Sequence, residues 1–191
     1  LVQVAGFDAV YLTGGGYSRA SGYPDVGLLT MTEITQYISR TVDAVDIPVI
    51  ADMDAGYGNA LNVIRSVREY EKTGVAAFHL EDQVSPKKCG HYEGKQVVSK
   101  AEMIGKIKAA VDTRRDGDLL IIARTDAIAP EGFEAAIERA TAHHDAGADV
   151  TFVEAPTSMQ QIADIPRLLP WPQLINLVLG GRGAVEVFVD G

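Results

Sequence analysis

The stretch Pro48-Val49-Ile50-Ala51-Asp52 is a short apolar run that ends in a carboxylate, and Asp54 follows it closely. A run of this length that is apolar on both faces is typical of a strand buried in a parallel sheet. Similar runs recur along the chain. The sequence predicts strands over residues 8–12, 48–52, 76–80, 119–123, 150–154 and 173–176.

Amphipathic stretches of helical length separate these runs. The expected helices cover residues 31–45, 60–73, 100–114, 132–146 and 158–169. Thr30 and Ser99 are typical residues for helix N-terminal caps, and Gly74 and Gly147 are typical of helix C-termini. Strands that alternate with helices in this way predict an α/β fold.

Polar or charged residues follow each expected strand at its carboxyl end. Six consecutive strands that deliver polar groups to one end are typical of an enzyme on a (β/α)8 TIM-type barrel. An open doubly wound sheet would instead concentrate its ligands near one switch point, so we favour the barrel. The strand-end residues are 13–16, Asp52, Asp54, Glu81, Arg124, Asp126, Glu154 and Asn176.

The length falls short of a whole barrel. Such a barrel typically takes about 250 residues, whereas this chain has 191. Residues 185–189 are a candidate seventh strand, but they follow Asn176 too closely to leave room for a crossover helix. We therefore expect one partial α/β barrel domain over residues 1–191, incomplete at one or both ends.

Composition excludes several functional classes. The 17 basic and 26 acidic residues give a formal net charge of −9, which disfavours a nucleic-acid partner. No run approaches the about 18 apolar residues of a membrane span, and the first residues lack a basic leader region. A single cysteine favours a reducing compartment. These features predict a cytoplasmic protein without a membrane partner.

The cysteine lies in the run Lys87-Lys88-Cys89-Gly90-His91. Positive neighbours lower the pKa of a thiol by favouring the thiolate, and an adjacent glycine permits turns that other residues resist. The alternative is a buried thiol that fills an apolar gap. Because the surroundings are polar, we predict a reactive thiol on a loop.

Asp52, Asp54 and Glu81 form a cluster of strand-end carboxylates that predicts a cation site. Hard oxygen donors without a nearby histidine or cysteine ligand set suit Mg²⁺, or Mn²⁺, better than Zn²⁺. Because Mg²⁺ keeps several waters, we expect one carboxylate to bind it directly and the others to bind through water. The alternative is that these acids cap helices or pair with lysine and arginine.

Several strings together resemble the isocitrate lyase and phosphoenolpyruvate mutase superfamily, in the right order over nearly the whole chain. Their combination is far more specific than one short motif. The strings are Tyr11-Leu12-Thr13-Gly14-Gly15-Gly16, Pro24-Asp25-Val26-Gly27, Ala51-Asp52-Met53-Asp54-Ala55-Gly56-Tyr57-Gly58, His79-Leu80-Glu81-Asp82-Gln83, Lys87-Lys88-Cys89-Gly90-His91 and Ala123-Arg124-Thr125-Asp126-Ala127.

The resemblance implies an incomplete-looking barrel in a helix-swapped homotetramer, a bound Mg²⁺ and chemistry on a small carboxylate substrate. It implies that Asp52 is the nearest metal ligand, with Asp25, Asp54 and Glu81 holding metal-bound water. Glu154 would complete the site, and Cys89 would be the general acid that protonates the departing carbanion. The implied substrate-binding residues are Tyr11, Thr13, Gly14, Gly15, Gly90, His91, Arg124 and Asn176.

Within the superfamily, a cysteine at position 89 favours carbon–carbon cleavage. Residues 176–182 resemble the dimethylmalate lyase and oxaloacetate hydrolase branch, whereas residues 99–148 suit 2-methylisocitrate lyase equally well. We therefore expect a lyase that cleaves a 2-hydroxy di- or tricarboxylate to a 2-oxoacid such as pyruvate plus a carboxylate. The alternatives are oxaloacetate hydrolase, a carboxyphosphonoenolpyruvate or phosphoenolpyruvate phosphonomutase, and an inactive truncated relic. The base that takes the hydroxyl proton is Tyr11, Glu154 or metal-bound water.

Three further expectations concern residues that the resemblance gives no role. His143 and His144 fall in a polar helix, so we expect both at the surface. Thr125 and Asp126 are expected to fix the strand end that carries Arg124. Trp171, between two prolines, is expected to anchor packing at a turn.

Overall fold

The computed structural model describes residues 1–88 and 94–176. Within these ranges six strands form one parallel sheet and pair in chain order. Strands that pair in chain order are typical of a barrel, whereas in a doubly wound sheet the order of the strands reverses at the switch point. The predicted partial barrel is therefore confirmed. The strands are β1 Val10–Leu12, β2 Val49–Asp52, β3 Ala77–Glu81, β4 Leu120–Thr125, β5 Val150–Val153 and β6 Gln173–Leu174.

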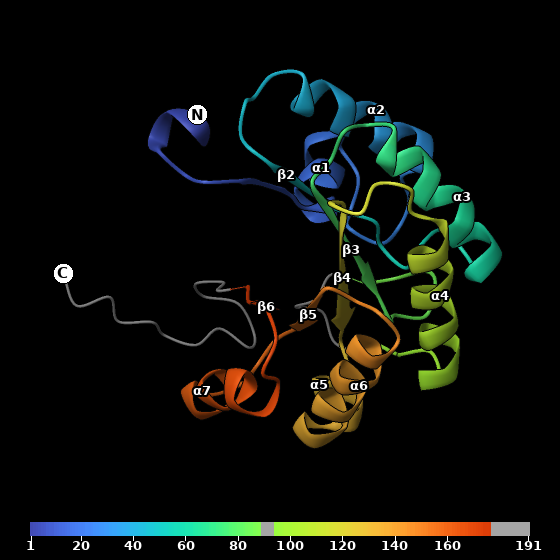
Figure 1. Ribbon diagram of the computed structural model, residues 1–191, viewed down its shortest axis with the longest axis vertical. Helices are drawn as coiled ribbons and strands as arrows, with labels where there is room; N and C mark the ends of the chain where they lie inside the picture. The colour runs from blue at the N-terminus through green and yellow to red at the C-terminus, as the bar shows by residue number, and fades with distance from the viewer. Residues whose placement is uncertain (89–93, 177–191) are drawn as a thin grey trace.

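The helices lie along an arc outside the strands, which gives the chain the shape of a half-barrel (Figure 1). Each of the five predicted helices is present, with ends that differ by a few residues. Two short helices, α1 and α5, were not predicted. The helical segments are η1 Gln3–Ala5, α1 Gly14–Ala20, α2 Met31–Val42, α3 Ala60–Glu71, α4 Lys100–Thr113, α5 Ile128–Glu131, α6 Phe133–Asp145 and α7 Met159–Leu168.

The predicted caps are present at the helix ends. The Thr30 side chain accepts a hydrogen bond from the backbone N–H of Glu33, and the Glu33 carboxylate accepts one from the N–H of Thr30. Ser99 caps α4 by accepting from the N–H of Glu102 at 3.1 Å. Gly74 and Gly147 follow α3 and α6 with φ of +79° and +106°, where a side chain would be strained.

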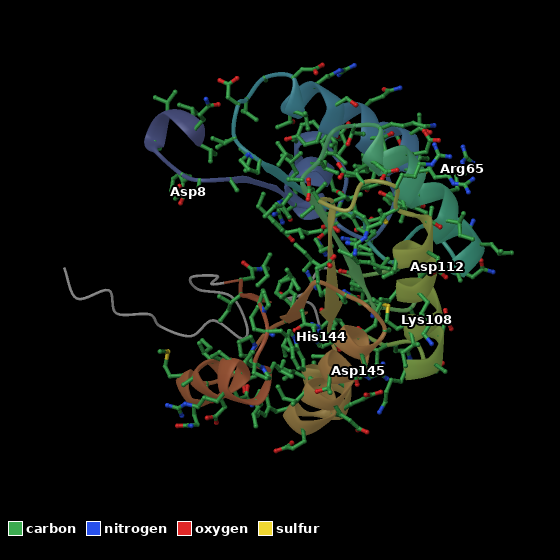
Figure 2. All side chains as sticks on the ribbon, in the orientation of Figure 1. Asp8, Arg65, Lys108, Asp112, His144 and Asp145 are labelled. Atoms are coloured by element: carbon green, nitrogen blue, oxygen red, sulfur yellow. The ribbon has the colours of Figure 1, made fainter. Side chains whose placement is uncertain are left out.

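The main core lies between the sheet and the helices. Val67 and Tyr70 of α3 and Ile107 of α4 are buried with Phe78 and Ile121 of the strands. Full burial of such a side chain contributes roughly 1.5–3 kcal/mol. The opposite sides of α3 and α4 carry exposed charged residues, including Arg65, Lys108 and Asp112 (Figure 2). The helices therefore shield one face of the sheet.

The smallest of three hydrophobic clusters in the described residues is formed by Ala77, Ile122 and Phe152. Because successive strand residues point to opposite faces, these side chains lie on the face away from the main core. This face and the carboxyl ends of the strands are left for the polar residues of the site.

The expectation of a surface position is wrong for His143, which is fully buried. It shares one helical face with Ala136 and Ala140, seven and three residues earlier in α6, and both alanines are buried. His144 is partly buried and its ring stacks on Trp171, with ring centroids 4.0 Å apart. The Trp171 Nε1 donates to Thr151 Oγ1 at 2.9 Å, so Trp171 is the expected anchor.

The helices within the described ranges include none with the length and apolar character that a bilayer crossing requires.

Candidate active site

The carboxylate of Asp52 is fixed at the end of β2 by two backbone donors. The N–H of Gly14 donates to Oδ2 at 2.8 Å, and the N–H of Asp54 donates to Oδ1 at 2.9 Å. A Cβ at position 14 would lie 2.9 Å from Asp52 Oδ2, so this approach requires glycine. The start of α1, which carries the predicted residues Thr13 to Gly15, is thereby held against β2.

His79 of β3 lies behind Asp52. Its Nε2 is 3.0 Å from Asp52 Oδ1, and its ring stacks on Tyr11 with centroids 5.7 Å apart. Burial alone would raise the pKa of Asp52, but His79 and then Lys87 outweigh it and hold this pKa below its ordinary value. Asp52 is therefore ionised.

Lys87 joins the other two aspartates of the predicted metal set. Its Nζ lies 2.6 Å from Asp25 Oδ1 and 2.8 Å from Asp54 Oδ1. Burial, followed by the charge of Asp52, raises the pKa of Asp54 to about 6, although Lys87 opposes this shift. Burial would lower the pKa of Lys87, but the surrounding carboxylates raise it above its ordinary value, so Lys87 is a buried ammonium.

The backbone at Gly15 and Asp54 allows Lys87 to contact both Asp25 and Asp54. A Cβ at Gly15 would lie 2.8 Å from Asp25 Oδ2, so the loop that carries Asp25 closes directly on the start of α1. Asp54 adopts a φ of +47°, a conformation that aspartate tolerates better than most residues. The sharp turn after β2 therefore aims the Asp54 carboxylate back toward Asp52 and Lys87.

Arg124 of β4 lies beside Glu81, its register partner in β3. Its Nε is 3.4 Å from Glu81 Oε2, and its Nη2 is 3.8 Å from Glu154 Oε1. The guanidinium lies 5.1 Å from the centre of the Phe152 ring. Burial would lower the pKa of Arg124, but Asp126, Glu81 and Glu154 raise it well above its ordinary value.

Asp126 holds the Arg124 guanidinium in place by accepting two hydrogen bonds from it. Lys95 donates to the same carboxylate at 3.0 Å. The backbone N–H of Asp126 and the Thr125 hydroxyl both donate to Asp82, at 2.9 Å and 2.7 Å. Thr125 and Asp126 thus fix the end of β4, as expected from the sequence. Burial would raise the pKa of Asp126, but Arg124 lowers it to about 2.

The chain on both sides of residues 89–93 is bonded to the segment that follows β3. The Gln83 side chain donates to Lys88 O at 2.9 Å and accepts from Lys88 N–H at 3.0 Å. On the other side, Val98 N–H donates to Asp82 O at 2.8 Å. Cys89, Gly90 and His91 lie outside the described residues, so their roles stay predictions.

The remaining predicted residues lie in a strand or shortly after one. Tyr11 of β1 is 39% exposed. Thr13 is the N-cap residue of α1. Glu154 is buried directly after β5, and Asn176 is exposed after β6.

The carboxylates fit a hydrated Mg²⁺. Glu81 Oε1 and Glu154 Oε2 are buried and have no hydrogen-bond partner within the described ranges, which is costly for a buried acceptor. In the same ranges, no three acidic, histidine or cysteine side chains are arranged to hold an ion directly. This arrangement is consistent with Mg²⁺, which commonly takes one or two protein carboxylates and keeps several waters.

Two functional residues were missed by the sequence reasoning. Lys87 was interpreted as a neighbour that activates Cys89, but it binds Asp25 and Asp54. Its position as the first residue of a recognised string was a usable signal. Lys95 had no local signal, because its partner Asp126 is 31 residues away.

Known proteins resemble this chain in sequence. The 2,3-dimethylmalate lyase of Eubacterium barkeri is 56% identical over 178 residues, which cover 93% of this chain and 62% of that protein. The 2-methylisocitrate lyase of Shewanella oneidensis is 46% identical over 183 residues, which cover 95% of this chain and 63% of that protein. This chain thus spans less than two thirds of the length of either relative.

Solved structures share the fold. A crystal structure of 2,3-dimethylmalate lyase, a member of the PEP mutase/isocitrate lyase superfamily, matches with a TM-score of 0.93 at 38% identity, covering 98% of this chain and 64% of that one. Phosphonopyruvate hydrolase in complex with oxalate and Mg²⁺ matches with a TM-score of 0.82 at 32% identity, covering 91% and 61%. The family model for phosphoenolpyruvate phosphomutase matches residues 1–188. The chain therefore belongs to the phosphoenolpyruvate phosphomutase family.

Proposed function

We propose that this protein is a magnesium-dependent lyase that cleaves a carbon–carbon bond of a 2-hydroxy di- or tricarboxylate, of the 2,3-dimethylmalate or 2-methylisocitrate type. The products are a 2-oxoacid such as pyruvate and a second carboxylate. The observation that carries the proposal is the Arg124 guanidinium, which Asp126 holds at the same strand ends as the carboxylates of Asp52, Asp54 and Glu81. The lyases named among the relatives support the reaction type.

Arg124 binds a substrate carboxylate in this proposal. An arginine presents its N–H groups in a planar fork that matches the two oxygens of a carboxylate. Asp126 satisfies Nε and one N–H of Nη2, so the guanidinium is oriented before substrate arrives. Tyr11, Thr13, Gly14 and Gly15 contact the pyruvyl end of the substrate, and Gly90, His91 and Asn176 contact its carboxylates.

Asp52 would hold the metal most directly, and Asp25, Asp54 and Glu81 would hold its water. When bound, Mg²⁺ supplies positive charge that stabilises the oxyanions formed as the bond breaks. The charge on Asp52 is maintained by His79 and Lys87, which keep its pKa low.

Bond cleavage requires two proton transfers. A base removes the proton of the substrate hydroxyl, the C2–C3 bond breaks to leave a carbonyl, and its electrons form an enolate on the second fragment. We assign the base to Glu154 Oε2, which is buried without a hydrogen-bond partner within the described ranges. Tyr11 is less suited. Desolvation of its hydroxyl, and then the charge of Asp52, raise the pKa of this hydroxyl, although the residue as a whole is 39% exposed. Cys89 then donates a proton to the enolate carbon.

The test is release of 2-oxoacids from 2-methylisocitrate, isocitrate and 2,3-dimethylmalate, and of oxalate from oxaloacetate, with Mg²⁺ and with EDTA. A phosphonate is assayed in parallel. We expect cleavage of one panel member that requires Mg²⁺ and that falls by at least about 100-fold in Arg124→Lys. Arg65→Lys on the outer side of α3 is the matched control and should retain activity. Cleavage of oxaloacetate alone would indicate a hydrolase, and turnover of a phosphonate alone would indicate a phosphonomutase.

We also propose a helix-swapped homotetramer of single-domain subunits in the cytoplasm. Family membership supports the assembly, and the single cysteine supports the compartment. Light scattering after size-exclusion chromatography should give four times the mass of the chain, and a monomer would contradict it.

A further inference from the structure

The ammonium group of Lys87 contacts two of the carboxylates assigned to the metal. Lys87 Nζ lies between Asp25 Oδ1 and Asp54 Oδ1, at 2.6 Å and 2.8 Å, and the side chain is 7% exposed. These two aspartates come from different loops, so their convergence on one cation is a tertiary feature. The Lys87 ammonium therefore contacts two of the carboxylates that would hold the waters of a bound Mg²⁺.

We propose that Lys87 and the divalent cation compete for the same carboxylates, so that cation binding frees the Lys87 ammonium from Asp25 and Asp54. This inference rests on the proposed metal site and adds a residue that sets its affinity. Without the metal, Lys87 reduces the repulsion among three neighbouring aspartates.

The competition follows from charge and from hydrogen-bonding capacity. A divalent cation and an ammonium at neighbouring positions repel each other strongly in a buried site, where the effective dielectric constant is low. The waters of a bound Mg²⁺ must donate to carboxylate oxygens, and Lys87 already donates to Asp25 Oδ1 and forms an ion pair with Asp54 Oδ1. The metal and Lys87 therefore cannot both make their best contacts with this pair.

The structure provides room for the displaced ammonium. A small cavity of about 50 Å³ lies next to Lys87 and is also lined by Leu29, Asp54, Tyr57 and Ser85. The lysine side chain has four rotatable bonds, so its head group can move away from the aspartates without a change in the backbone. Gly27, which is opposite the Lys87 stem, leaves the Cγ uncrowded.

Chemical labelling of the purified protein tests the displacement directly. Lysines are acetylated briefly with acetic anhydride, with and without saturating Mg²⁺, and the modified positions are quantified by mass spectrometry. We expect Mg²⁺ to increase labelling of Lys87 several-fold. Lys95 is the internal control, because it is equally buried but donates to Asp126, outside the metal set. Unchanged or decreased labelling of Lys87 under saturating Mg²⁺ would overturn the proposal.

Metal affinity provides a second readout that is independent of turnover. Mn²⁺ binding, followed by electron paramagnetic resonance, should be about tenfold tighter in Lys87→Met than in the wild type. Lys108→Met, on the exposed side of α4, should bind Mn²⁺ as the wild type does. Equal or weaker binding in Lys87→Met would overturn the proposal. If this variant does not fold, labelling of the wild type decides.

The outcomes separate this inference from the proposed function. Metal-dependent exposure of Lys87 without cleavage of any panel substrate would support the competition and contradict the lyase reaction. Substrate cleavage, together with labelling of Lys87 that does not change when Mg²⁺ is added, would support the lyase reaction and overturn the competition. No saturable Mn²⁺ binding in the wild type would overturn both the metal site and the competition.

Discussion

Arg124 and Asp126 form a bidentate ion pair. Arg124 Nε donates to Asp126 Oδ2 at 2.8 Å, and Arg124 Nη2 donates to Asp126 Oδ1 at 3.0 Å. Both residues are buried. Lys95 donates to the same carboxylate, so Asp126 is shared by two cations. The pair therefore combines orientation of Arg124 with compensation of buried charge.

We expect Asp126→Asn to impair both catalysis and folding. Arg124 would lose a charged partner, so kcat/KM should fall by about 100-fold or more as its orientation is lost. Removing one partner of a buried ion pair costs about 3–5 kcal/mol. Steady-state kinetics and urea unfolding measure the two effects. Asp112→Asn, on the exposed side of α4, is the control and should change neither. Wild-type kcat/KM in Asp126→Asn would show that this pair does not orient Arg124.

Gly14→Ala should weaken metal binding. The added Cβ would lie 2.9 Å from Asp52 Oδ2 and 3.3 Å from Asp54 Oδ1, so it would displace the carboxylates on which the metal depends. We expect Mn²⁺ affinity to fall by about tenfold or more in a titration.

Gly105→Ala is the matched control for this substitution. It places the same methyl group in α4, where nothing lies within 4 Å. This change should leave Mn²⁺ affinity intact and raise the free energy of unfolding by about 0.5–1 kcal/mol, because alanine favours a helix over glycine. Equal Mn²⁺ affinity in both variants would contradict the close packing of Gly14 on Asp52.

Cys89→Ser should separate metal binding from turnover. A hydroxyl is a much weaker acid than a thiol, so transfer of a proton to the enolate should be slowed by orders of magnitude. Mn²⁺ titration should give the wild-type affinity, because the proposed metal ligands are unchanged. Activity within a factor of two of the wild type would assign the proton donor elsewhere.

His143 should make the protein less stable in acid. Burial lowers its pKa to about 3 in the folded state, from an ordinary value of 6.5. The unfolded chain therefore binds a proton more readily, and stability is lost as the pH falls below about 6.5 toward 3. The free energy of unfolding falls by up to about 1.4 kcal/mol for each pH unit in this range.

His143→Leu removes this titration, so its stability should fall less steeply than that of the wild type between pH 7 and pH 5. Urea unfolding at the two pH values measures the difference. His144→Leu tests the neighbouring, partly buried histidine in parallel. The same pH dependence in His143→Leu and the wild type would contradict the buried, neutral state of His143.

Much of the fold was predictable because its signals are local. The strands β2 to β5 are short runs that are largely buried on both faces. The caps at Thr30 and Ser99 act within three residues. The positions of Asp52, Asp54, Glu81 and Arg124 after their strands also predicted that these residues lie at one end of the sheet. A parallel sheet brings the carboxyl ends of its strands to one edge, whatever the length and conformation of the loops.

The other features depend on contacts between distant residues. The glycines of α1 disfavour a helix by about 1 kcal/mol each, and the start of this helix is bonded to Asp52, 38 residues away. Lys95 depends in the same way on Asp126, 31 residues away. The burial of His143 was recoverable from the spacing of Ala136 and Ala140 on the same face of α6.

The most direct test of the central claim is to measure pyruvate and propionate released from 2,3-dimethylmalate by the purified protein. We expect equal amounts of the two products, with formation abolished by EDTA, restored by Mg²⁺ and reduced by at least about 100-fold in Arg124→Lys. Absence of both products from a folded sample that binds Mn²⁺, on this substrate and on the rest of the panel, would contradict the assignment as a carbon–carbon lyase.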